Sequence, residues 1–138
     1  MIEKERLEEA KRNAKIYIAD SLLKIGDRDA ARFVDFFMAN ADSSLRTASI
    51  LQEISDDNSL KETLKVGLGF ESYLWVIVSS YYSMFYAATA ILAKQGIRAT
   101  GQIVHKVTAD ALIHFFASNE KLAKLLEQYE EAQTVGLE

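Results

Sequence analysis

The chain has 138 residues and a net charge of −4 at pH 7, and 49% of its residues are hydrophobic. This length fits one domain with a substantial core, and the acidic balance argues against a protein that coats duplex nucleic acid through its phosphates. Cysteine and proline are absent, which excludes disulfides and cysteine metal sites and disfavours long stiff linkers. The charged N-terminal sequence is not that of a signal peptide, so we expect a cytoplasmic protein.

Two long helices are expected in the first part of the chain. Apolar residues recur at helical spacing over residues 3–25, and Gly26 is a natural helix stop. A second helix is expected over residues 28–54, before the polar residues 56–58 break it. Residues 33–38 are more apolar than one helix face requires, so this cluster fits either the core or a contact with a partner subunit.

One short helix and three longer ones are expected in the rest of the chain. Ser59 and Glu62 form a capping-box pattern for a short helix, and a long central helix is expected over residues 70–95, with Gly96 as its stop. The remaining elements are a loop over residues 97–102, a helix over 103–117 and a last helix capped by Ser118. No alternating strand pattern occurs, so the sequence predicts an all-α antiparallel bundle of four to five helices.

The central helix raises the question of a membrane span, because residues 72–93 carry no charge and are long enough to cross a bilayer. Its tyrosines argue against a span: Tyr81, Tyr82 and Tyr86 would lie near the middle of the membrane, whereas tyrosine prefers the interfaces. We therefore expect no membrane contact and a central helix that is buried on nearly all sides of the bundle.

The two histidines of the chain, His105 and His114, do not form a metal site. They lie nine residues apart on one expected helix and therefore on opposite sides of it. Neither has a carboxylate at ligand spacing on its own face, so no metal and no cofactor is expected. We expect a structural role for His114.

Arg98 and His105 could act together at the start of the fourth long helix. A helix N-terminus attracts anions and disfavours a charged imidazolium. An Arg and a His at the mouth of a loop could hold a phosphate and transfer a proton. The alternative is that His105 helps to cap its helix while Arg98 is solvated.

Small side chains recur every four residues on the central helix, at Ser79, Ser83 and Ala87. Small residues allow another helix to approach closely, which gives one interpretation of this ridge. The other is a line of hydroxyl groups that opens into a polar cleft.

Residues 79–92, with Gly96 and then His105-Lys106 after a loop, resemble the signature helix and following loop of HEPN domains. Residues 40–48 look like the first core helix of that family. The resemblance covers residues 38–130 of the single domain 1–138, and residues 1–37 look like an added N-terminal helical region. It implies a HEPN-like helical bundle that often forms a homodimer.

Many HEPN proteins are metal-independent ribonucleases, frequently toxins paired with a nucleotidyltransferase antitoxin. Their motif is an Arg, four to six residues and a His near the dimer interface, and Arg98 and His105 meet that spacing. Ala99 stands where active members usually have a polar residue.

The resemblance thus implies Arg98 and His105 as catalytic residues acting on RNA. The residues expected to contribute to binding are Ser79, Tyr82, Ser83 and Lys106. The alternative function is a non-catalytic HEPN module that binds a nucleotide or a partner protein.

Overall fold

A computed structural model describes residues 2–137, and 75% of the chain is helical. The helices are α1 (Lys4–Ala19), the 3-10 helix η1 (Ala30–Phe33), α2 (Val34–Asp56), α3 (Asn58–Leu64), α4 (Tyr73–Lys94), α5 (Val104–Phe116) and α6 (Glu120–Leu137). Two strands of two residues each, β1 (Leu23–Lys24) and β2 (Arg98–Ala99), pair antiparallel. The all-α class is confirmed, but these residues contain six α-helices and not four to five.

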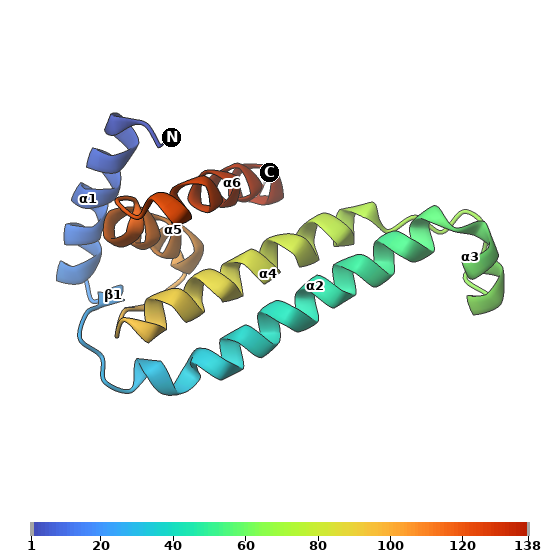
Figure 1. Ribbon diagram of the computed structural model, residues 1–138, viewed down its shortest axis with the longest axis horizontal. Helices are drawn as coiled ribbons and strands as arrows, with labels where there is room; N and C mark the ends of the chain where they lie inside the picture. Colours follow the sequence, from blue (N-terminus) through green and yellow to red (C-terminus); the bar gives the residue numbers. More distant parts are fainter. Residues whose placement is uncertain (1, 138) are drawn as a thin grey trace.

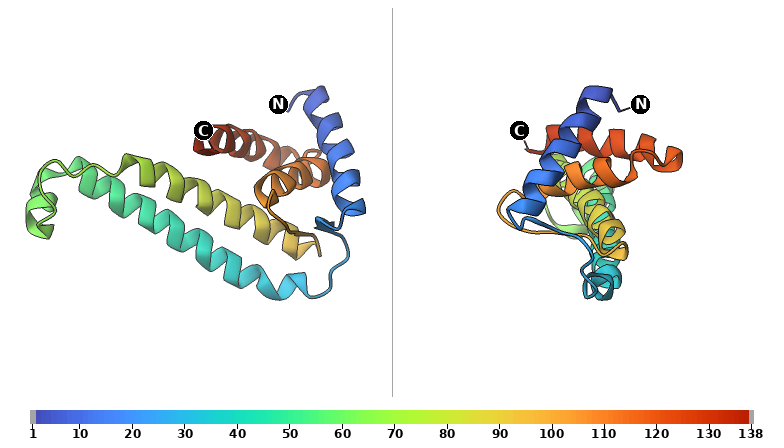
Figure 2. Two further views of the ribbon diagram at one scale, coloured as in Figure 1. Left: turned by 180° about the vertical axis from the view of Figure 1, so that it is seen from behind. Right: turned by 90° about the vertical axis from the view of Figure 1, so that its left-hand side faces the viewer.

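The longest helices, α2 and α4, lie antiparallel and side by side as a long arm, with α3 at its far end (Figure 1). Small residues bring the two helices together: Ala41 and Ala48 are buried on α2, and the Ser83 hydroxyl of α4 donates a 2.7 Å hydrogen bond to the Ala41 carbonyl. Helices α1, α5 and α6 gather at the other end of α4 (Figure 2). The molecule therefore consists of a helical cluster from which a two-helix arm projects.

The central helix α4 is not buried on nearly all sides, and that expectation is wrong. Helices α5 and α6 contact α4 at Tyr81 and further along the helix. Leu74, Trp75 and Ile77 near its start are 68%, 59% and 46% exposed. Among the described residues α4 is the one helix long and apolar enough to cross a membrane by length and composition. A single helix of this kind is weak evidence for a membrane protein.

The helix expected over residues 3–25 ends early, at Ala19. Ser21 adopts a left-handed conformation (φ 61°), and the Leu22 N–H donates a 2.8 Å hydrogen bond back to the Tyr17 carbonyl. This pairing closes the helix in the manner of a Schellman motif. The chain then extends into β1, whose partner β2 lies in the expected loop 97–102.

Three other boundaries differ from expectation. The second helix begins as η1 at Ala30 and not at residue 28. Helix α3 is capped by Asp57 and not by Ser59, because the Asp57 carboxylate accepts a hydrogen bond from the Leu60 N–H at 3.1 Å. Before α6 it is Asn119, and not Ser118, whose side chain accepts from a backbone N–H, that of Lys121.

The apolar cluster of residues 33–38 belongs to the core only in part. Phe33, Val34 and Phe37 are partly buried. Phe36 and Met38 are exposed, and therefore remain available to a partner or a ligand.

The N-terminal helix α1 shares its core with α5 through a buried carboxylate. Asp110 of α5 is fully buried, and it accepts hydrogen bonds from the Tyr17 hydroxyl at 2.7 Å and the Asn13 amide at 3.1 Å. Arg6 forms a 2.7 Å ion pair with Asp110 and a 2.6 Å pair with Glu130 of α6. Residues 1–37 therefore contribute a helix that is bound into the cluster by charge as well as by apolar packing.

Candidate functional site

His105 lies in the first turn of α5, half-buried among aromatic rings of α4. Its Nδ1 shares a 2.7 Å hydrogen bond with the Tyr81 hydroxyl. The ring centroid of Phe85 is 4.1 Å away, and Tyr82 meets the imidazole edge-on at 5.6 Å. Burial lowers the pKa of His105 below its ordinary value of 6.5, so the ring is neutral and fixed in orientation at pH 7.

Tyr81 can hold the imidazole in one orientation because its own ring is held in place by its neighbours. Its side chain is buried, and its ring stacks on that of Tyr129 from α6 at 6.1 Å. Burial raises the pKa of the Tyr81 hydroxyl, so this group stays protonated and can donate. A hydroxyl that donates to Nδ1 leaves the ring hydrogen on Nε2 of His105, pointing away from Tyr81.

A groove of about 370 Å³ lies between α2 and α4 on the other side of Tyr82. Its aromatic wall comes from α4 and its polar wall mainly from α2. The lining residues are Asn40, Ser43, Ser44, Thr47, Trp75, Val78, Ser79, Tyr82 and Tyr86. The Tyr82 ring lines the groove and also contacts His105, which is itself not one of the lining residues.

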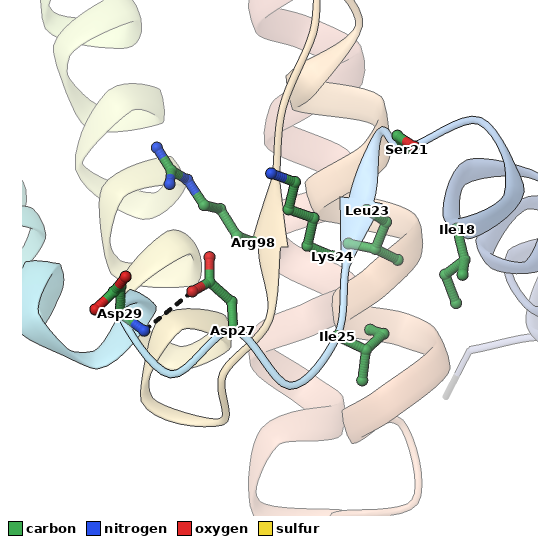
Figure 3. A pocket seen from close by; sticks show the side chains of 8 residues that line it. All are labelled: Ile18, Ser21, Leu23, Lys24, Ile25, Asp27, Asp29 and Arg98. Atoms are coloured by element: carbon green, nitrogen blue, oxygen red, sulfur yellow. Dashed lines mark hydrogen bonds between the residues drawn. The ribbon is translucent and has the colours of Figure 1, made fainter.

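Arg98 occupies a different place, on strand β2 beside β1. It pairs in register with Lys24, and Figure 3 shows both side chains at a hollow of about 620 Å³ that also contains Asp27 and Asp29. The guanidinium carbon of Arg98 lies 5.6 Å from the centre of the Phe33 ring. No carboxylate of residues 2–137 forms an ion pair with Arg98 within 4.0 Å.

Within one chain, Arg98 and His105 do not line a common pocket of the described residues. They share Phe85, whose ring contacts His105 and also lines a cavity beside Arg98. Lys106 is exposed next to His105.

The expected binding residues on α4 separate into two groups. Ser79 and Tyr82 meet in the groove, whereas the Ser83 hydroxyl is engaged by the Ala41 carbonyl at the helix contact. The small-residue ridge is therefore a close helix contact at Ser83, and of its two hydroxyl groups only that of Ser79 belongs to a residue that lines the groove. No group of three or more His, Cys, Asp or Glu side chains that could hold a metal occurs within residues 2–137.

Two contributors were not identified from the sequence: Tyr81, which orients His105, and the polar wall of α2. The polar wall of α2 could have been predicted from the sequence, since Ser43 and Thr47 are four residues apart and must share a helix face. Trp75 and Tyr82 are seven apart on α4 and also share a face. The role of Tyr81 depends on a contact between two helices, which spacing along one helix does not reveal.

Comparison of the chain with protein-family models, with curated proteins and with solved structures finds no match. The resemblance to HEPN domains accordingly rests on the residues of this chain: the Tyr81-Tyr82 helix, Gly96 and His105.

Proposed function

We propose that this chain is a HEPN-like helical module that binds a nucleotide in the groove between α2 and α4. The observation that carries the proposal is the groove itself, which places Trp75, Tyr82 and Tyr86 opposite the polar side chains of α2. Of these three rings, that of Tyr82 also contacts His105. Its volume of about 370 Å³ lies within the range of small-molecule sites.

The composition of the groove favours a base as the bound group. Aromatic side chains stack on bases of any sequence, and hydroxyl and amide groups hydrogen-bond to their edges. The net charge of −4 argues against a long phosphate track, since such binding is driven by neutralising many phosphates. One nucleotide, with its phosphate toward His105 and Lys106, requires far less positive charge.

Titration calorimetry with adenosine and cytidine monophosphates tests this proposal. We expect Tyr82→Leu to weaken binding by about ten-fold or more, because one stacked ring contributes about 1–3 kcal/mol. The control is Phe115→Leu, which removes a partly exposed ring of α5 outside the groove. Absence of nucleotide binding by the wild-type chain at millimolar concentration would overturn the proposal, as would equal binding by both variants.

We further propose that the module is a homodimer. Ile77, Met84 and Ile91 recur every seven residues on α4 and so form one stripe, and Leu125 of α6 is exposed beside its C-terminal part. Met84, Ile91 and Leu125 line an apolar groove between α4 and α6 of about 200 Å³. Apolar surface of this kind is typical of a protein–protein contact.

A metal-independent ribonuclease, as in toxins paired with a nucleotidyltransferase antitoxin, is the second candidate. The orientation of a neutral His105 by Tyr81 favours it, because a general base must be neutral and positioned. The Arg would then come from the partner subunit across a two-fold axis.

Incubation of single-stranded RNA with the protein in the presence of a chelator tests the second candidate. Cleavage that is lost in both His105→Ala and Arg98→Ala, with unchanged melting temperatures, would support it. Absence of cleavage by the wild-type dimer, or cleavage that survives in His105→Ala, would exclude it and leave the binding module.

A further inference from the structure

A second cavity, of about 420 Å³, lies where η1, α2, α4, β2 and α5 meet. Its walls are largely apolar, and they include the phenyl rings of Phe33, Phe36, Phe37 and Phe85. The rings contact one another, with centroids 5.6 Å apart for Phe36 and Phe37 and 6.3 Å for Phe33 and Phe37. Arg98 lines the same cavity and lies over Phe33, so the cavity combines an aromatic interior with one cation.

Thr108 lines this cavity, and its hydroxyl oxygen, which has less than 1 Å² of accessible surface, has no hydrogen-bond partner among the described residues. Thr108 is 1% exposed. The other helical threonines each donate to the carbonyl four residues earlier: Thr47, Thr63, Thr89 and Thr134. A buried hydroxyl without a partner is costly, and a polar atom of a ligand in the cavity would satisfy it.

The hollow next to the cavity contains two cations, Lys24 and Arg98, and two carboxylates, Asp27 and Asp29. Arg98 and its cross-strand neighbour Lys24 carry like charges, which disfavour each other. Neither forms an ion pair within 4.0 Å among residues 2–137. The nearby Asp27 carboxylate accepts a hydrogen bond from the Asp29 N–H instead. A bound anion would relieve the repulsion between the two cations.

We propose that this cavity binds a small aromatic carboxylate that carries a second polar group. The rings of Phe33, Phe37 and Phe85 surround the aromatic body, Arg98 pairs with the carboxylate, and the Thr108 hydroxyl bonds to the second polar group. A single guanidinium in a mainly apolar cavity suits a monoanion better than a phosphate, whose greater charge needs more donors. This site is separate from the nucleotide groove and does not depend on the proposed function.

Three related probes test the site by titration calorimetry: 6-hydroxy-2-naphthoate, 2-naphthoate and 2-naphthol. We expect the hydroxynaphthoate to bind most tightly, and Arg98→Gln to weaken both carboxylates by about ten-fold or more while 2-naphthol changes little. Thr108→Val should remove the preference for hydroxynaphthoate over naphthoate and also raise the melting temperature, since it deletes an unpartnered buried group.

Two controls separate this site from the general surface and from the groove. Arg12→Gln removes an exposed arginine of α1 and should leave all three affinities unchanged, and Tyr82→Leu, which alters the nucleotide groove, should do the same. The proposal is overturned if the wild-type protein binds none of the probes at millimolar concentration. It is also overturned if Arg98→Gln binds the carboxylates as the wild type does.

Discussion

Asp110 shows how one residue joins two helices, α1 and α5. Its carboxylate is fully buried, yet it is surrounded by the Arg6 guanidinium, the Tyr17 hydroxyl and the Asn13 amide. Removing a carboxylate from water is costly, and each of these contacts offsets part of the cost. Burial, together with the hydrogen bond to Asp110, raises the pKa of Tyr17, so this hydroxyl remains a donor.

Asp110→Ala is expected to lower the free energy of unfolding by about 3–5 kcal/mol, because it leaves the Arg6 charge without its buried partner. The matched control is Arg46→Ala, which breaks an exposed pair with Asp42 on α2 and should cost about 0–1 kcal/mol. Chemical denaturation measures both. Equal losses for the two variants would show that the buried pair does not hold α1 to α5.

His105 should make stability depend on pH below neutrality. Burial lowers its pKa in the folded chain, so below about pH 6.5 the unfolded chain binds more protons than the folded one. The free energy of unfolding should therefore fall as the pH is lowered from 7 to 5.5, and His105→Gln should reduce this slope.

The control for this titration is His114→Gln. The pKa of His114 is also lowered, mainly by burial, but its side chain is exposed, so solvent should make its contribution smaller. NMR titration of the two imidazoles provides a direct check. A folded-state pKa of His105 at or above 6.5 would contradict the prediction.

At the scale of elements, the segment between α4 and α5 sets the positions of both Arg98 and His105. It passes through Gly96 (φ 73°) and Gly101 (φ 95°), two left-handed conformations that favour glycine. Gly101 also has little room for a side chain, because an added Cβ would lie 2.7 Å from the Leu22 Cδ2. The N-terminus of α5 is thus held against the segment that follows α1.

Gly101→Ala is expected to destabilise the protein by about 1–3 kcal/mol, through backbone strain and the contact with Leu22. Gly69→Ala is the control, since Gly69 has open space around it and no positive φ. Thermal unfolding of the two variants measures the difference. A melting temperature of Gly101→Ala equal to that of the wild type would show that the segment adjusts without cost.

The long helices were predictable from the sequence, and the short elements were not. Helix α5 was expected over residues 103–117 and spans Val104–Phe116 because its periodic apolar residues have a core to meet. Strands of two residues carry no periodicity, so β1 and β2 depend on tertiary pairing alone. The exposure of α4 was missed for a related reason: an apolar helix does not reveal whether its own chain or a partner covers it.

The candidate site likewise contains residues whose positions could be predicted from the sequence and residues whose positions could not. Of the four expected binding residues, Ser79 and Tyr82 both line the groove, since residues three apart on one helix share a face. The position of Arg98 over Phe33 depends on the pairing of β1 with β2 and on η1. Contacts between elements far apart in the sequence were beyond the reach of spacing rules.

At the scale of the whole molecule, the projecting arm leaves much apolar surface without a partner. Exposed large apolar residues occur on both of its long helices, among them Phe36 and Leu45 on α2 and Ile77 and Ile91 on α4. A monomer rarely exposes an extended apolar surface. The homodimer that we propose would cover the α4 stripe, and symmetric association of two identical copies is the commonest form of oligomer.

Light scattering at high micromolar concentration should give the mass of a dimer for the wild-type chain. The variant Ile91→Glu combined with Leu125→Glu should be a monomer, because it places two carboxylates in the apolar groove between α4 and α6 and burying an unpaired charge is strongly unfavourable. Leu45→Glu, on the exposed face of α2 and outside this groove, is the control and should remain a dimer. If the wild type is a monomer, the homodimer is excluded, and the α4 stripe must be covered by a different protein. If Leu45→Glu alone dissociates the dimer, the two copies meet through α2 instead.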